Sequence, residues 1–338
     1  MKNGIEKADR ELYFFNKKIR FSVLNPLNVE QEMRKVMKDS SYNPQLKYQQ
    51  PLPTFHEIKG KLVSLEVDDS IMGKLLHYRR NEFLKMVLML ENVGKDKFTS
   101  SSLNLYGKPS PDLVKKAYRL LNKESEEKEA QYSGISVVKK FLDSLLCQGL
   151  RWQVKEKDMV AGAAFDVGRR VLLINPKRRF SDTDLKRLIV HEIGTHIIRA
   201  ENGTHHRHKL FLIGFPHYLP TEEGLAVYNE ERAGLLSNNL LKTYAARVVA
   251  VDLALHSSFT MVYTALREFF PPEDAFTLAL RAKRGLANTA NPGALTKDYY
   301  YLKGYEDMKR YVAQGGSLAP LYTGKVGIEH VPFLRYLD

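Results

Sequence analysis

Apolar residues recur at helical spacing through most of this chain. A repeat of three or four residues places them on one side of a helix, which is the pattern of a helix that packs against a core. This pattern predicts helices at residues 5–20, 28–39, 69–92, 111–122, 133–146, 181–202, 222–236, 239–256, 259–270, 273–286 and 296–313. We therefore expect a mostly helical protein.

Strand-like patterns are confined to the middle of the sequence. Residues 152–155, 161–167 and 171–174 are short runs rich in β-formers, and Gly168 marks a turn between the last two. They predict a small antiparallel sheet just before the helix at residue 181. The expected fold class is α+β, mostly helical. Residues 42–55, which contain several prolines, are expected to be extended, and residues 98–111 are expected to form a loop.

The helix at residues 181–202 contains the sequence HEIGTH, from His191 to His196. Ser181 and Asp184 form a capping-box pattern at its start. Two histidines that flank Glu192 on one helix can bind a divalent metal and activate a water molecule. The motif favours a zinc hydrolase, although two unrelated histidines on opposite faces would give the same letters.

The spacing of the two histidines differs from the common H-E-x-x-H motif by one residue. A residue four positions along an α-helix lies about 40° away around the axis, whereas a residue five positions along lies about 140° away. A π-type turn accommodates one extra residue and would bring His196 back beside His191. Gly194 is a weak helix former inside this segment. We predict a wide turn around residues 193–195.

A zinc hydrolase also needs a third protein ligand. The histidines at 205, 206 and 208 lie among basic residues, which is typical of a solvated loop. We expect them to lie in such a loop, which can line an active-site cleft, rather than to bind the metal. Thr221 is a candidate N-cap for the next helix, so Glu222 and Glu223 have two interpretations. One of them is the missing ligand, or both simply complement the helix dipole.

HEIGTH followed about 30 residues later by EGLA resembles the microtubule-associated tyrosine carboxypeptidases and their bacterial relatives, the QEGLA-motif proteins. The segments SSSLNLYGKPSP, RAKRGL and GALTKDYYYLKGYEDM also look like family segments. The resemblance implies a gluzincin-like metallopeptidase with a zincin-like core and one zinc ion. His191, His196 and Glu223 would be the zinc ligands and Glu192 the general base. Glu222 stands where the bacterial motif has Gln.

The resemblance also implies an activity, which is removal of a C-terminal residue, tyrosine or another aromatic, from an acidic protein tail. In a eukaryote that tail would be the one of α-tubulin, and the activity would be detyrosination. Binding a terminal carboxylate requires an Arg or Lys near the metal. Arg281, Arg284 and Lys297 are the candidates, of which we favour Arg284 and Lys297.

Further polar groups are needed around such a site. An oxyanion donor is expected among the tyrosines at 218, 228, 299 and 301, and Glu230 is a candidate acceptor for a histidine N–H. The strand at residues 159–165, with its small residues, is expected to pair with the substrate backbone, or else to pack under a helix.

We expect an N-terminal helical and extended layer at residues 1–55 and a catalytic domain at residues 56–338. The metal-site core of that domain would span about 150–236, and its helical C-terminal part 237–338.

Composition supports a globular intracellular protein. The 338 residues are 43% hydrophobic and 10% aromatic, and Cys147 is the single cysteine, which excludes an internal disulfide. We expect Cys147 to be a core residue. Neither a signal peptide nor an apolar run of about 18 residues is visible, so we expect a cytoplasmic protein without a membrane segment.

The net charge of +13 attracts polyanions in general. No zinc finger or RNA-binding motif is recognisable, so nucleic acid is not the expected partner, whereas an acidic peptide tail fits. Two alternatives remain, namely a zinc endopeptidase or aminopeptidase with the same zinc site, and a non-enzymatic basic regulatory protein.

Overall fold

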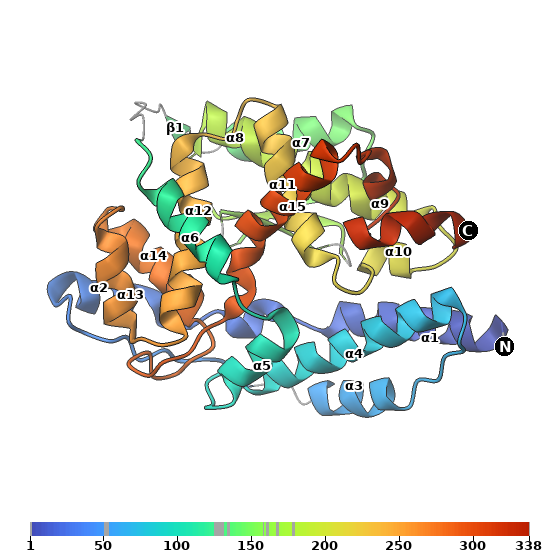
Figure 1. Cartoon of the computed structure of the whole chain (residues 1–338), viewed down its shortest axis with the longest axis horizontal. Coiled ribbons are helices and arrows are strands. Elements are labelled where there is room, and N and C mark those ends of the chain that lie inside the picture. Colours follow the sequence, from blue (N-terminus) through green and yellow to red (C-terminus); the bar gives the residue numbers. More distant parts are fainter. Residues whose placement is uncertain are drawn as a thin grey trace.

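Helices make up most of the computed structural model, as the apolar periodicity predicts (Figure 1). The structure describes residues 2–50, 54–124, 132–133, 136–157, 159, 162–166, 169–177 and 180–337. The α-helices are α1 (Lys2–Lys18), α2 (Val29–Lys38), α3 (Thr54–Val63), α4 (Ile71–Glu91), α5 (Phe98–Tyr106), α6 (Pro111–Leu121), α7 (Ser136–Cys147), α8 (Asp182–Leu188), α9 (Ile198–Thr204), α10 (Leu210–Ile213), α11 (Leu219–Arg232), α12 (Asn238–Ala254), α13 (Phe259–Arg267), α14 (Pro272–Lys283) and α15 (Tyr300–Ala313). A π-helix, η2 (Ile189–Ile197), joins α8 to α9. Short 3₁₀ helices are η1 (Phe21–Leu24), η3 (Thr296–Tyr299), η4 (Ala319–Tyr322) and η5 (Ile328–Tyr336).

The sheet next to the π-helix η2 is mixed, so the prediction of an antiparallel sheet is wrong in part. Its strands are β2 (Gln153–Glu156), β3 (Ala163–Asp166) and β4 (Val171–Ile174), in the spatial order β2-β4-β3. β3 pairs antiparallel with β4, but β2 pairs parallel with β4. Alternation of side chains predicts strands but not their partners, so the sequence did not reveal this arrangement. A second, two-stranded antiparallel sheet joins β1 (Tyr132–Ser133) and β5 (Phe180–Ser181).

Three apolar clusters fill the interior of the described chain. The first joins α1, α4 and α10, and includes Leu12, Phe83 and Phe215, which are fully buried. The second surrounds α12, which packs against α6, α13 and α14. The third lies between the three-stranded sheet and the π-helix and includes Ile193 and Ile197. In Figure 1 the N-terminal helices α1, α3, α4 and α5 form the lower layer, and α10, α11 and α15 lie above it. Whether the chain divides at residue 55 stays a prediction.

Helix starts follow their sequence signals where a short polar side chain is present. Ser181 accepts a hydrogen bond from the N–H of Asp184, and Asp184 bonds back to the N–H of Ser181, so the predicted capping box is confirmed. The prediction that Thr221 caps the next helix is wrong. α11 already begins at Leu219, and the Thr221 hydroxyl instead accepts a hydrogen bond from the N–H of Ile328.

Two helices occupy segments that we expected to be irregular. α3 starts at Thr54, inside the stretch predicted to be extended, and buries Phe55, Ile58 and Leu62 at helical spacing. α5 occupies most of the predicted loop at 98–111, and its terminal residues Phe98 and Tyr106 are buried. Serines and threonine are weak helix formers, so burial of the flanking aromatics decides the conformation of α5.

α11 and α15 cross in backbone contact at two glycines. A Cβ atom on Gly224 would lie 2.1 Å from the carbonyl carbon of Gly304, and a Cβ on Gly304 would lie 1.9 Å from the Pro220 oxygen. This contact positions the N-terminal half of α11.

Gly224→Ala is therefore expected to separate the two helices and to destabilise the protein by about 3 kcal/mol, the upper end of the usual cost of overpacking. Denaturant titration measures this. Gly60→Ala, in α3, is the matched control because nothing lies within 4 Å of its Cβ position. The control should stabilise slightly, and equal stabilities of the two variants would contradict the predicted contact.

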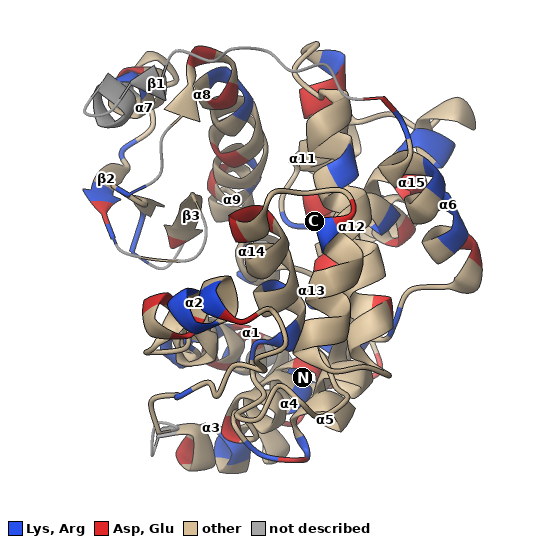
Figure 2. Ribbon diagram, turned by 90° about the vertical axis from the view of Figure 1, so that its left-hand side faces the viewer, with Lys and Arg blue, Asp and Glu red and all other residues tan. Residues whose placement is uncertain are grey.

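No helix in the described part of the chain is long and apolar enough to cross a membrane. Lys and Arg are interspersed with Asp and Glu along the helices that face the viewer (Figure 2).

Candidate metal centre

The π-helix η2 carries the HEIGTH motif. It spans Ile189–Ile197 and includes the wide turn predicted at residues 193–195, which is thereby confirmed. The hydroxyl of Thr195 donates to the carbonyl of Val190, five residues earlier. The extra residue per turn places His191 and His196 on the same side of the helix, with ring centroids 4.9 Å apart. The alternative of two histidines on opposite faces is excluded.

Side chains from other elements stabilise this turn. The Tyr322 hydroxyl, from η4, donates to the carbonyl of Gly194. The amide nitrogen of Asn229, on α11, donates to the hydroxyls of Thr195 and Tyr322, at 2.8 and 2.7 Å. The Gly194 carbonyl and the Thr195 hydroxyl, both in the π-turn, thereby have hydrogen-bond partners outside the helix. Neither Asn229 nor Tyr322 was among the residues predicted for this site.

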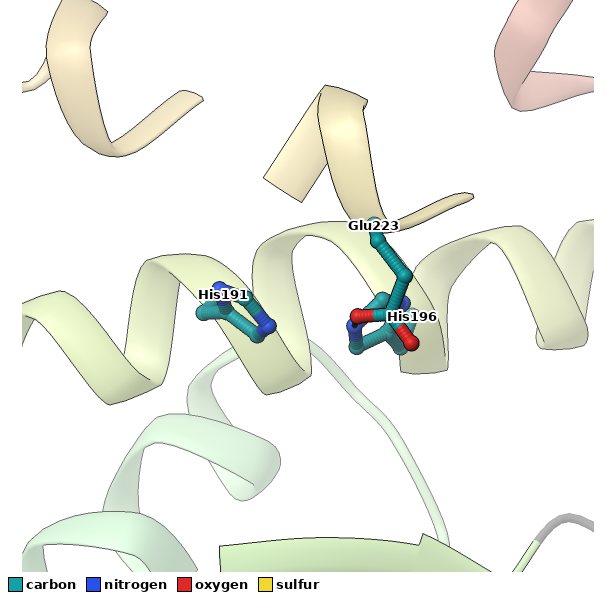
Figure 3. Close-up of side chains that lie close together, drawn as sticks. All are labelled: His191, His196 and Glu223. Carbon is teal, nitrogen blue, oxygen red and sulfur yellow. Dashed lines mark ion pairs between the residues drawn. The ribbon is translucent and has the colours of Figure 1, made fainter. Parts of the chain in front are cut away.

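Glu223 completes a group of three possible metal ligands. It lies on the first half of α11, which packs against the π-helix, and its carboxylate reaches toward His196 (Figure 3). Each of His191, His196 and Glu223 offers a ligand atom, and these three atoms lie within 4.8 Å of one another. All three residues are buried. The described residues contain no other such group.

Both histidines are oriented through their Nδ1 atoms. His191 Nδ1 lies 2.8 Å from Glu230 Oε1, and His196 Nδ1 lies 2.9 Å from Glu222 Oε1. An Nδ1–H that donates to a carboxylate leaves the Nε2 lone pair free for a metal. Glu230 was expected in this role, whereas Glu222 was considered only as a ligand or a dipole-compensating residue.

Glu222 and Glu230 remain ionised because of their neighbours. Burial alone would raise the pKa of Glu222, but the charges of Lys325 and Arg199 and the His196 hydrogen bond hold it well below its usual value. Burial also opposes ionisation of Glu230, and there the His191 hydrogen bond and Arg187 lower the pKa. Two acceptors with full charge make the histidines better electron donors.

Lys297 neighbours the third possible ligand. Its Nζ lies 3.3 Å from Glu223 Oε1. Burial would raise the pKa of Glu223, but Lys297 and the two histidines outweigh it and lower that pKa. The fit of the site to a metal ion follows from its donor set, which is two imidazole nitrogens and one carboxylate aimed at one point.

A cleft of about 340 Å³ opens beside the metal group. His191 and Glu192 line it, together with Ala163 of β3 and Tyr301 of α15. β3 is an edge strand, and its Phe165 stacks on His196 with ring centroids 4.9 Å apart. The predicted strand at 159–165 thus lies beside the site from residue 163 onward, while residues 160 and 161 are outside the described part of the chain.

Of the other residues predicted for the site, some line the cleft and others do not. Arg284 is not among the residues that line the cleft, and its Nη2 lies 4.0 Å from Asp298. Among the four candidate tyrosines only Tyr301 lines the cleft, as far as the described residues show; the Tyr299 hydroxyl, for example, donates to the carbonyl of Tyr106. Of the histidine-rich loop, His206 stacks on Phe211, and it is not one of the three possible metal ligands. Whether Arg284 or Lys297 binds substrate stays a prediction.

Comparison with known proteins assigns the chain to a family. A sequence model described as microtubule-associated tyrosine carboxypeptidase matches residues 35–338. The chain belongs to this family. That match covers both the π-helix and α11, and therefore the whole group of possible ligands.

Named relatives agree with this assignment. Microtubule-associated tyrosine carboxypeptidase 1 of Rattus norvegicus is 27% identical over 322 residues, which are 92% of this chain and 61% of the relative. The protein of that name from Homo sapiens is 27% identical over 324 residues, 92% of this chain and 60% of the relative. Putative tyrosine carboxypeptidase MATCAP2 of Mus musculus is 26% identical over 333 residues, 94% of this chain and 56% of the relative. The chain thus spans about 60% of the length of these relatives.

Proposed function

We propose that this protein is a zinc-dependent metallocarboxypeptidase that removes a C-terminal residue, tyrosine or another aromatic, from a peptide or protein tail. The observation that carries the proposal is the convergence of His191, His196 and Glu223, each buried and each with a possible ligand atom within 4.8 Å of the others. Membership of the tyrosine carboxypeptidase family supports the reaction class.

Zinc is the metal that this donor set favours. Two histidines and one glutamate are a known ligand set of catalytic zinc, and three protein ligands leave a position for water or substrate. When bound, zinc would polarise the scissile carbonyl group and lower the pKa of a water molecule. The cleft, which His191 and Glu192 line, is the proposed access route to that position.

Glu192 is the proposed general base. It follows His191 directly and lines the cleft. Its carboxylate would take a proton from the attacking water and deliver it to the leaving amine. Tyr301, on the same cleft, is the proposed hydrogen-bond donor to the oxygen that becomes negative during the attack.

β3 is the proposed binding site for the substrate backbone. An extended peptide can add to an edge strand through main-chain hydrogen bonds, and small side chains leave room for it. β3 has Ala163 beside the cleft, with Gly162 just before the strand, and lies at the edge of the described three-stranded sheet.

The relatives from Rattus norvegicus and Homo sapiens are named for the removal of tyrosine and for association with microtubules. We extend this to the substrate here, an acidic tail like that of α-tubulin. The net charge of +13 supports attraction to such a tail.

The test combines metal analysis with mass spectrometry of peptides. The purified protein should contain a single zinc ion per chain and should shorten acidic peptides that end in Tyr by one residue. Matched peptides with a blocked C-terminus should stay intact, whereas those with a blocked N-terminus should be shortened. Internal cleavage, or trimming from the N-terminus, would contradict the carboxypeptidase proposal and favour an endopeptidase or aminopeptidase.

A further inference from the structure

The cleft beside Glu192 contains three arginines, and two of them are already neutralised. Arg187 donates to Glu230 at 2.9 Å, and Arg281 donates to Asp298 at 2.5 Å. The third, Arg247 on α12, has no ion pair with a carboxylate in the described part of the chain, and its Nε atom is buried without a hydrogen-bond partner. A buried donor without a partner is unusual in a folded protein and points to a missing acceptor.

The guanidinium group of Arg247 is held in place by aromatic rings. Its Cζ lies 4.3 Å from the ring centroid of Tyr301 and 5.2 Å from that of Tyr244. The two rings are parallel, with centroids 5.5 Å apart. These cation–π contacts hold the guanidinium without using its N–H groups as hydrogen-bond donors to the protein, so the N–H groups remain available to a planar anion.

The cleft is small, and one part of its wall is apolar. Phe180, Leu188, Phe270 and Leu278 form that part, whereas Thr243 and Thr277 are polar residues of the lining. The volume of about 340 Å³ is near the lower end for ligand sites. Asp274, the acidic residue that lines the cleft besides Glu192, is exposed. Such a pocket fits one large apolar side chain with a carboxylate next to it.

We infer that Arg247 binds the terminal carboxylate of the substrate through a two-pronged hydrogen bond, and that the apolar wall accepts the side chain of the terminal residue. The inference rests on the proposed carboxypeptidase function and assigns its specificity for a free C-terminus to α12. Arg284 and Lys297 then act through Asp298 and Glu223 rather than on the substrate.

The test measures binding without turnover. In the Glu192→Gln background, the affinity for a peptide with a free C-terminal Tyr is compared with the affinity for the same peptide with a C-terminal amide, by calorimetry. Arg247→Met is expected to weaken binding of the free acid at least about 30-fold, because it removes one partner of a desolvated charge pair. Amide binding should change little, and in the otherwise wild-type enzyme KM for the free acid should rise correspondingly.

Lys242→Met is the matched control, since it removes a cation from the same helix at a position that does not line the cleft. It should bind both peptides as the parent does. Arg247→Lys retains the charge but loses the forked geometry, and it should weaken acid binding about tenfold. If Arg247→Met fails to fold, the acid-over-amide preference of Arg247→Lys tests the inference instead.

Unchanged acid-over-amide preference in the folded Arg247 variants would overturn the inference while leaving the carboxypeptidase proposal intact. Failure of the wild-type protein to trim any free C-terminus would instead refute the proposed function itself.

Discussion

Glu192→Gln is expected to reduce peptide cleavage by about 10²–10⁴-fold, the usual contribution of a general base, while zinc content and stability stay unchanged. Glutamine has nearly the same shape but accepts no proton at neutral pH. Glu192 is not one of the three groups that surround the metal position, so its replacement should leave the ligand set intact. Steady-state kinetics on a Tyr-terminated peptide and metal analysis of the same sample measure the two quantities.

Glu201→Gln is the matched control for this variant. Glu201 lies on α9, in the same continuous helix, and accepts a hydrogen bond from Trp152, which glutamine can also accept. Its rate should equal that of the wild type. Full activity of the Glu192→Gln enzyme would exclude Glu192 as the general base. If no cleavage is found and polyanions bind with a steep dependence on salt concentration, a regulatory, non-enzymatic protein is favoured.

Glu223→Ala is expected to abolish zinc binding at neutral pH and, with it, activity. Two histidines alone leave an incomplete site, so the affinity should fall by more than the tenfold to hundredfold that the loss of an outer hydrogen-bond partner causes. Because a ligand that binds only the folded state stabilises it, added zinc should raise the unfolding temperature of the metal-depleted wild type but not of Glu223→Ala. Competition with a chelator gives the affinities.

Variants at two other glutamates of α11 serve as comparisons for the zinc affinity of Glu223→Ala. Glu222→Gln weakens the hydrogen bond that orients His196, so it should lower the zinc affinity only tenfold to hundredfold. Glu231→Ala removes an acid outside the metal group, one that contacts Tyr305, and should retain wild-type affinity. Equal loss of zinc from Glu222 and Glu223 variants would leave the choice of the direct ligand open.

Local sequence signals sufficed where the cause of a structure is itself local. The capping box at Ser181 and Asp184 requires residues three positions apart, and the π-turn follows from the five-residue separation of His191 and His196 if both are to face one ion. Glu223 belonged to the predicted ligands because of the family resemblance, since helix-dipole compensation explained it equally well. The convergence of Glu223 with the histidines depends on how α11 packs on η2.

Predictions failed where burial depends on distant parts of the chain. Cys147 was expected in the core because it follows an apolar run, but it is exposed. The buried residues of α7 include Phe141 and Leu145, four residues apart, and position 147 lies on another face of that helix. α5 formed against weak local propensity because Phe98 and Tyr106 are buried and Ser102 contacts Thr296, nearly two hundred residues later.

By itself the sequence determined the helical character of this protein, the motif that carries the two histidines and Glu192, and, through resemblance, the family. Only the tertiary structure decided which carboxylates orient the histidines, how β2 pairs with β4, and which arginine in the cleft has a buried Nε without a hydrogen-bond partner among the described residues. The reason is physical: helix formation and capping depend on residues within a turn of one another, whereas ion pairs, strand partners and buried donors depend on side chains that meet only after folding.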